Sequence, residues 1–176
     1  MSTDAAKKPG VLDRVESWAK IIGVAVACFG VWKYYDQIEQ GRIDKSIAYF
    51  DEYHRGALLN ARADIGAASI RWLKVAQREP KPPLEAFIAM TLADLRSNEL
   101  WLQSEIVVEF YDRLAACAAL NACDADTALR LFSAEAREFQ GLIGPLIAYV
   151  REEGDQNFAS GLQCFAAGGG CVFQET

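Results

Sequence analysis

Histidine and proline are scarce in this sequence, and their scarcity narrows the classes of protein it can belong to. Its 176 residues include one histidine, His54, and five prolines. A di-metal four-helix bundle needs two Glu-x-x-His pairs, so a single histidine excludes it. Few prolines, with abundant alanine and leucine, favour an all-α protein.

Catalytic motifs are also missing. There is no Gly-x-Ser-x-Gly elbow to present a nucleophilic serine. The glycines at 168–170 lack the strand-to-helix context of a phosphate-binding loop. Asp51 and His54, at i and i+3, are one candidate metal pair, but His54 lies on an apolar helical stripe. We therefore interpret His54 as a packed, hydrogen-bonded side chain.

Three carboxylates are the remaining candidate for acid–base chemistry. Glu105, Glu109 and Asp112 share one helical face at i, i+4 and i+7, and such proximity can raise one pKa. They lie opposite the apolar stripe of their helix, with Arg113 adjacent, so we interpret them as a solvated face. We expect no catalytic residue, no cofactor and no metal site.

Apolar runs of full bilayer length are absent too. The longest uncharged apolar run, 21–32, has 12 residues, or about 18 Å of helix. A bilayer core is roughly 30 Å thick, and runs this short are often buried helices or signal-peptide cores. Counted with its flanks, from Trp18 to Tyr35, the segment reaches about 27 Å.

The flanks of this run favour a membrane helix nonetheless. Lysine stems extend to the interface, and Trp and Tyr gather at headgroup depth. Six residues are the predicted membrane-interface anchors: Trp18, Lys20, Trp32, Lys33, Tyr34 and Tyr35. We predict a transmembrane helix and stalk over 11–40. Two alternatives stay open: a buried core helix, and a signal peptide cleaved after Ala27, before Cys28.

Helical periodicity predicts a soluble antiparallel bundle of about four helices over 42–165. Apolar residues recur every three or four positions from Arg42 to Arg78, and the prolines at 80–83 end that helix. Glycine at 56 weakens this helix without ending it, whereas Gly144 and Pro145 bend or break a later one. Residues 1–10 and 166–176 are expected to be flexible ends.

Charge is distributed unevenly along the chain. Residues 1–81 carry a net charge of +3, residues 82–176 carry −9, and no lysine follows Lys81. No concentrated basic surface is visible, which excludes nucleic acid as the expected partner. Arg71, Lys74 and Arg78 share a helical face and are candidate contacts for lipid phosphates or an acidic partner, although such a face is commonly just solvated.

The chain has five cysteines, and their number does not decide between an oxidising and a reducing compartment. Cys28 lies in the predicted membrane helix. Cys117, Cys123, Cys164 and Cys171 can form two disulfides in three pairings, and their spacing is too long for a typical zinc site. We expect reduced thiols and a cytoplasmic domain at the cell membrane, although the flanking charges do not settle the orientation.

The distal part of the chain resembles small bacterial proteins of unknown function that have one N-terminal membrane helix and a helical domain. The resemblance rests on the Phe-rich segment 110–132 with its Cys123-Asp124 turn, on Phe139, and on the segment 144–151, which ends in Arg. It covers about the last two thirds of the chain and implies an anchor plus an interaction domain.

These patterns together predict a single-pass, membrane-anchored, non-catalytic protein-interaction module. Its expected partners are the lipid bilayer and either another protein or a second copy of the chain. The alternatives are an accessory subunit of a larger membrane complex and an enzyme centred on His54.

Overall fold

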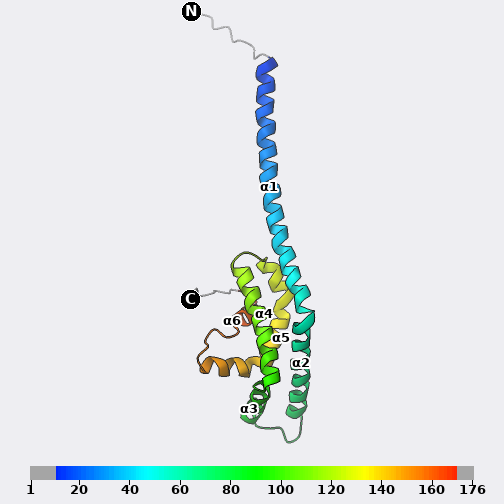
Figure 1. Cartoon of the computed structure of the whole chain (residues 1–176), viewed down its shortest axis with the longest axis vertical. Helices are drawn as coiled ribbons and strands as arrows, with labels where there is room; N and C mark the ends of the chain where they lie inside the picture. Colours follow the sequence, from blue (N-terminus) through cyan, green and yellow to red (C-terminus); the bar gives the residue numbers. More distant parts are fainter. Residues whose placement is uncertain (1–10, 170–176) are drawn as a thin grey trace, which may run out of the picture. The chain divides into compact units, whose positions relative to one another are not determined.

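The computed structural model describes the backbone of residues 11–169 and their side chains, except those of 11–17, 19, 21 and 98. Over these residues the chain is all-α, which confirms the predicted fold class. Six helices follow one another (Figure 1): α1 (Val11–Tyr53), α2 (Gly56–Ala76), α3 (Leu84–Leu95), α4 (Asn98–Ala119), α5 (Ala125–Glu152) and α6 (Ser160–Ala166). The predicted flexible end at 1–10, and 170–176 of the other end, lie outside the described residues.

The chain divides into two compact units, residues 1–40 and residues 41–176. The described part of the first unit is a single helical segment, since α1 begins at Val11 and continues through Gln40. The second unit contains the end of α1 and the five helices that follow.

The transmembrane prediction for 11–40 needs correction. No helix in the described part of the chain is both long enough and apolar enough to cross a membrane. Helix α1 has 43 residues, so its length is sufficient, but Lys20 and Lys33 confine its uncharged part to 21–32.

An aromatic cluster forms the centre of the second unit. Its five members come from four helices: Tyr53, Phe110, Tyr111, Phe132 and Phe165, each at most 1% exposed. The ring centroids of Tyr53 and Phe132 are 5.4 Å apart in an edge-on arrangement, and those of Phe110 and Phe132 are 5.5 Å apart. Such geometry adds to the hydrophobic stabilisation that burial supplies.

One hydrogen bond inside the aromatic cluster satisfies its two phenols. The Tyr111 hydroxyl donates to the Tyr53 hydroxyl across 3.1 Å. Burial, above all other causes, raises the pKa of both groups. Both phenols therefore stay neutral near pH 7, and we assign them a structural role.

The first half of the predicted helix from Arg42 to Arg78 is wrong in two respects. Helix α1 ends at Tyr53, and α2 begins at Gly56, whose φ of +60° only glycine adopts easily. The expected inward stripe before this break is also rotated, because Ile47 is exposed while Ser46 is buried. The apolar stripe expected over α2 is confirmed at four positions, because Ala61, Ile65, Ala68 and Trp72 are buried. At its start the stripe is displaced by one residue, since Leu58 is buried and Ala57 is exposed.

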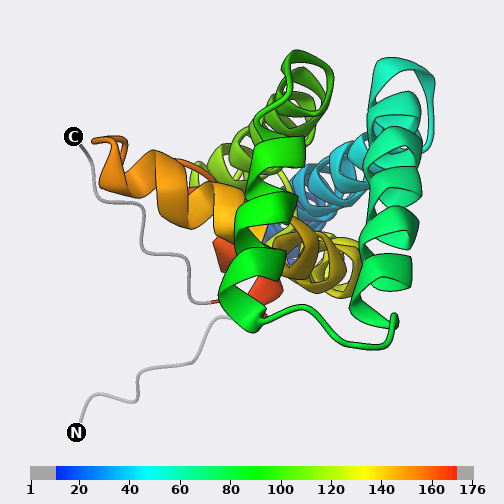
Figure 2. The same cartoon turned by 90° about the horizontal axis from the view of Figure 1, so that it is seen from below.

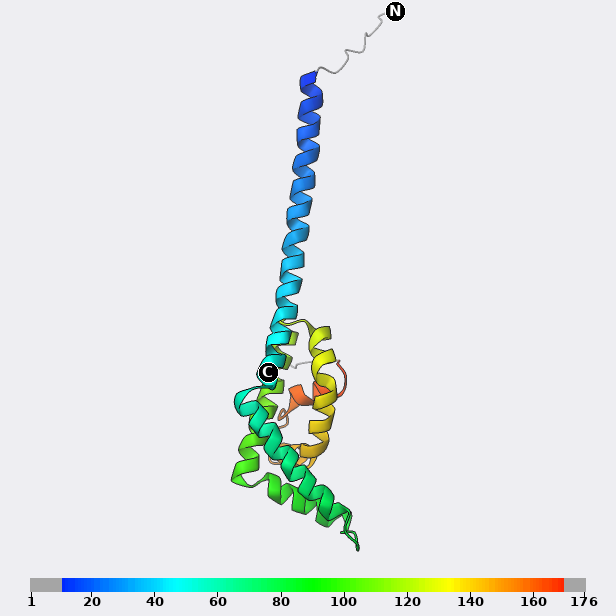
Figure 3. The ribbon, with the colours of Figure 1, turned by 90° about the vertical axis from the view of Figure 1, so that its right-hand side faces the viewer.

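Helix α2 packs along α4 (Figure 3), and a side-chain contact joins it to α3. The Trp72 indole donates from Nε1 to Asp94 Oδ2 at 2.8 Å. The connection between α2 and α3 is the proline-rich segment 77–83, which Figure 2 shows as an irregular loop. Proline lacks the N–H that a continued helix requires, so the two helices separate here as predicted.

The loop from α4 to α5 is closed by a disulfide. Cys117 and Cys123 are bonded, with their Cα atoms 5.3 Å apart, and Cys164 is also in a disulfide-bonded state. The expectation of reduced thiols is therefore wrong for these cysteines. Sequence spacing left this pairing open among three, and the turn after α4 brings the first two together.

Helix α5 begins at a capping aspartate. Asp124 Oδ1 accepts a 2.8 Å hydrogen bond from the Thr127 backbone N–H. Hydrogen bonds from the side chain and backbone of Thr127 lower the Asp124 pKa, while slight burial opposes them. The same residue is tied to α1, because its N–H donates to Arg42 O at 3.2 Å.

Asp124→Ala is expected to lower the free energy of unfolding of the second unit by about 1 kcal/mol at pH 7. Because the folded Asp124 pKa is depressed, its contribution to stability is present above the ordinary aspartate pKa of 3.8 and is lost as pH falls through the folded pKa. Urea titrations of both proteins at several pH values measure this difference. Asp124→Asn, which caps without titrating, is expected to keep its stability at neutral pH; equal losses in both variants contradict the account.

Candidate functional site

The segment Trp18–Tyr35 of α1, called the apolar segment below, has large apolar side chains on its surface. Nine of them are between 57% and 67% exposed: Trp18, Ile22, Val24, Val26, Phe29, Val31, Trp32, Tyr34 and Tyr35. Consecutive residues from 22 to 35 are all exposed, so exposed side chains surround the helix on every side. Contiguous exposed apolar surface of this kind marks an interaction site.

Both ends of the apolar segment combine lysine with aromatic rings. Lys20 and Lys33 are exposed. At the second end, Phe29 and Trp32 lie with ring centroids 5.7 Å apart, and Tyr34 and Tyr35 lie 6.1 Å apart. The structure thus places the six predicted anchors on one helix; their membrane-interface role stays a prediction.

Small residues interrupt the large ones in the apolar segment. A Cβ added at Gly23 or Gly30 would meet nothing within 4 Å. Packing within the described structure therefore does not require glycine there. The segment also contains the exposed free cysteine Cys28.

The predicted basic face of Arg71, Lys74 and Arg78 is only partly formed. Helix α2 ends at Ala76, so Arg78 lies beyond the helix that carries the other two. Arg71 pairs with Asp94 at 3.4 Å, with both side chains substantially exposed. Such surface pairs add little stability, and nothing in their geometry identifies a ligand.

His54 and Asp51, the candidate pair, have different partners. Asp51 instead pairs with Arg55 at 3.5 Å, and the described residues contain no group of three or more potential metal ligands. His54 Nδ1 lies 2.9 Å from the Phe50 carbonyl oxygen. The histidine is hydrogen-bonded as expected, and its ring lies against that of Phe50, with centroids 4.3 Å apart, but it remains exposed.

The three carboxylates on α4 separate into two kinds. Glu105 and Glu109 are exposed, as predicted for a solvated face. Asp112 is partly buried, and its Oδ1 accepts a 2.7 Å hydrogen bond from the Gly161 N–H. Burial raises the Asp112 pKa, against the lowering effect of that bond. Asp112 therefore fixes α6 against α4.

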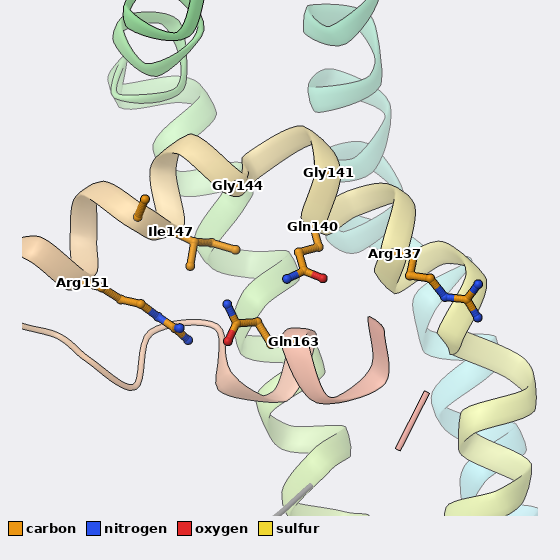
Figure 4. A pocket seen from close by; sticks show the side chains of 8 residues that line it. Arg137, Gln140, Gly141, Gly144, Ile147, Arg151 and Gln163 are labelled. Atoms are coloured by element: carbon orange, nitrogen blue, oxygen red, sulfur yellow. The ribbon is translucent and has the colours of Figure 1, made fainter. Parts of the chain in front are cut away.

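A pocket on α5 and α6 was not predicted. Helix α5 changes direction near Gly141 and Gly144, as Figures 1 and 4 show, which confirms the expected bend. A cavity of about 590 Å³ lies there, the bend pocket, lined by Arg137, Gln140, Gly141, Gly144, Ile147, Ala148, Arg151 and Gln163. The signal in the sequence was the Gly-x-x-Gly-Pro segment between two arginines.

The bend pocket has a basic and amide lining. Its two charged residues, Arg137 and Arg151, are both cationic, and Gln140 and Gln163 add polar groups. Arg151 is fixed by the Phe158 carbonyl, which accepts from Nε at 3.1 Å and Nη2 at 2.8 Å. Arg137 is exposed.

Comparisons with protein-family models, curated proteins and solved structures give no match to this chain. The resemblance to small bacterial membrane-anchored proteins therefore stays a prediction. Two surfaces of the described chain are candidate interaction sites: the apolar segment and the bend pocket.

Proposed function

We propose that this protein is a non-catalytic helical interaction module, attached to a membrane through the apolar segment of α1. The second unit serves as its soluble antiparallel bundle and binds a protein partner or a second copy. The observation that carries the proposal is the exposure of apolar side chains on every side of α1 between Ile22 and Tyr35. Water is a poor environment for such a surface, and lipid is a good one.

The ends of the apolar segment support lipid as its environment. Lysine ammonium groups reach the interface while their stems remain in hydrocarbon. Indole and phenol rings favour headgroup depth, and Trp32 and Tyr35 stand beside Lys33. A water-soluble helix partner would not need this arrangement of charge and aromatic rings.

The disulfide indicates the redox environment of the second unit. Bonds such as Cys117–Cys123 persist in oxidising environments and are rare in the cytosol. We therefore place the second unit on the oxidising side of the membrane, in place of the cytoplasm expected from reduced thiols.

Val26→Lys tests the attachment. A lysine at the middle of the segment costs about 3 kcal/mol relative to an apolar residue, so it should reduce membrane partitioning by about 100-fold. Membranes washed with alkaline carbonate are assayed for the full-length chain. Wild type is expected in the pellet and Val26→Lys in the supernatant.

The matched control is Ile70→Lys, since Ile70 on α2 is also more than half exposed. It is expected to pellet like wild type. A wild-type chain that remains soluble without detergent, or a Val26→Lys variant that still pellets, contradicts the attachment.

A second candidate, an accessory subunit of a larger membrane complex, is favoured by the glycines. The open space at Gly23 and Gly30 permits close approach of a neighbouring helix. Purification in mild detergent followed by native mass measurement separates the two candidates. Non-identical subunits that co-purify support the accessory subunit, whereas monomers or homo-oligomers support the module. An enzyme centred on His54 has less support, given the exposed position of His54 and the pairing of Asp51 with Arg55.

A further inference from the structure

We propose that the bend pocket binds an acidic peptide segment of a partner protein, with one carboxylate against Arg151 and another against Arg137. This inference rests on the proposed role as an interaction module and names the chemistry its partner presents. Four features of the pocket support it: its charge, its fixed arginine, its backbone acceptor and its glycines.

The charge of the pocket is opposite to that of the surrounding sequence. Residues 82–176 hold 5 basic and 14 acidic residues, and two of those five basic residues line the bend pocket. The lining includes no carboxylate. Within the described part of the chain, the Arg137 side chain makes no ion pair or hydrogen bond. A lining whose charged side chains are all cationic favours anions.

Arg151 is held ready for a ligand. Its Nε and Nη2 atoms already donate to Phe158 O, which fixes the plane of the guanidinium. The remaining N–H groups keep their fork geometry for a carboxylate. Asp112 interacts electrostatically with Arg151, so this carboxylate, which lies outside the lining, offsets part of the Arg151 charge. Figure 4 shows Arg151, Gln140 and Gln163 directed toward a common space, with Arg137 at the other end of the pocket.

A backbone acceptor distinguishes a peptide from a simple anion. Glycine has no side chain, so Gly141 lines the pocket with backbone atoms. Its carbonyl cannot receive the usual helical hydrogen bond from residue 145, because Pro145 has no N–H. An acidic peptide presents backbone N–H groups beside its carboxylates, which suits both this carbonyl and the arginines. Phosphate and small tricarboxylates present no N–H donor.

The glycines have no steric explanation within the described structure. A Cβ added at Gly141 or Gly144 would meet nothing within 4 Å. Glycine inside a helix costs about 1 kcal/mol relative to alanine. Residues without side chains at these positions keep the pocket open for a ligand.

The test measures peptide binding to the full-length chain in detergent at about 150 mM salt, where weak surface electrostatics are screened. The probe is a fluorescein-labelled, N-acetylated hexaglutamate, compared with hexaglutamine by fluorescence anisotropy. Hexaglutamate is expected to bind at least tenfold more tightly. Arg137→Gln removes a cation from the pocket, and Gly144→Leu fills the pocket with a side chain. Each variant should weaken hexaglutamate binding at least tenfold. Thermal unfolding is expected to show both variants as stable as wild type.

Arg130→Gln is the matched control, because Arg130 is an exposed arginine on α5 outside the pocket. It should change the affinity less than twofold. The proposal is overturned if hexaglutamate does not bind. It is also overturned if Arg130→Gln loses as much affinity as Arg137→Gln, or if Gly144→Leu binds hexaglutamate as tightly as wild type. Displacement by citrate at an affinity equal to that of the peptide also overturns it, in favour of a small-anion site. Membrane pelleting of the same variants before solubilisation is independent of these results, so failure of the pocket and failure of the membrane attachment are distinguishable.

Discussion

Phe132→Ala is expected to lower the free energy of unfolding of the second unit by about 3–5 kcal/mol. The Phe132 ring is fully buried, and it contacts members of the aromatic cluster from α1, α4 and α6. Its removal loses the transfer free energy of the ring and leaves a cavity that the rigid neighbouring rings fill poorly. Chemical denaturation followed by circular dichroism measures the loss.

The control for this variant uses the same chemical change at an exposed position. Phe29→Ala removes a ring that is 58% exposed and lies in the first unit, so it should leave the unfolding of the second unit unchanged. A loss below about 1 kcal/mol in Phe132→Ala would mean that the aromatic cluster is not the centre of the core.

Gly161→Ala is expected to destabilise the second unit by about 3 kcal/mol, the upper end for overpacked sites. A Cβ at Gly161 would lie 2.5 Å from the Tyr111 carbonyl oxygen and 2.7 Å from Asp112 Cα. Both neighbours are backbone atoms of α4, so they cannot rotate away. The displacement of α6 would also strain the bond from the Gly161 N–H to Asp112.

Gly66→Ala is the matched control for the second variant. A Cβ at Gly66 would meet nothing within 4 Å, and alanine is the better helix former. This variant should therefore be as stable as wild type or more stable by about 0.5–1 kcal/mol. Similar stabilities of Gly161→Ala and Gly66→Ala in urea titrations would contradict the close packing of α6 on α4.

The sequence predicted those helices whose apolar residues form one clear stripe. In α5, charged residues lie between the apolar ones, and the apolar residues Phe132, Phe139 and Ile143 are buried. In α4 the apolar residues differ in burial: Leu102 is 54% exposed, whereas Val107 and Tyr111 are buried. Apolar residues occur on several sides of α4, so periodicity alone does not select the face that packs.

The candidate sites differ in how much the sequence revealed. The apolar segment is contiguous, so its residues and flanking lysines could be read directly. The bend pocket forms where Gln163 of α6 lies beside residues of α5. This contact is part of the tertiary structure, so the pattern of residues along the sequence does not reveal it. The Cys117–Cys123 pairing likewise needed the turn between two helices, because spacing allowed other partners.

Cys28 offers the most direct measurement of the central proposal, burial of the apolar segment in a membrane. It is exposed and unpaired in the described structure and lies within the uncharged run. In intact membranes, a membrane-impermeant maleimide should label Cys28 at least tenfold more slowly than Ile70→Cys in a Cys28→Ala background. After denaturation in detergent and urea, both should react at similar rates. Equal labelling rates in intact membranes would show that water reaches the segment and would contradict the proposal.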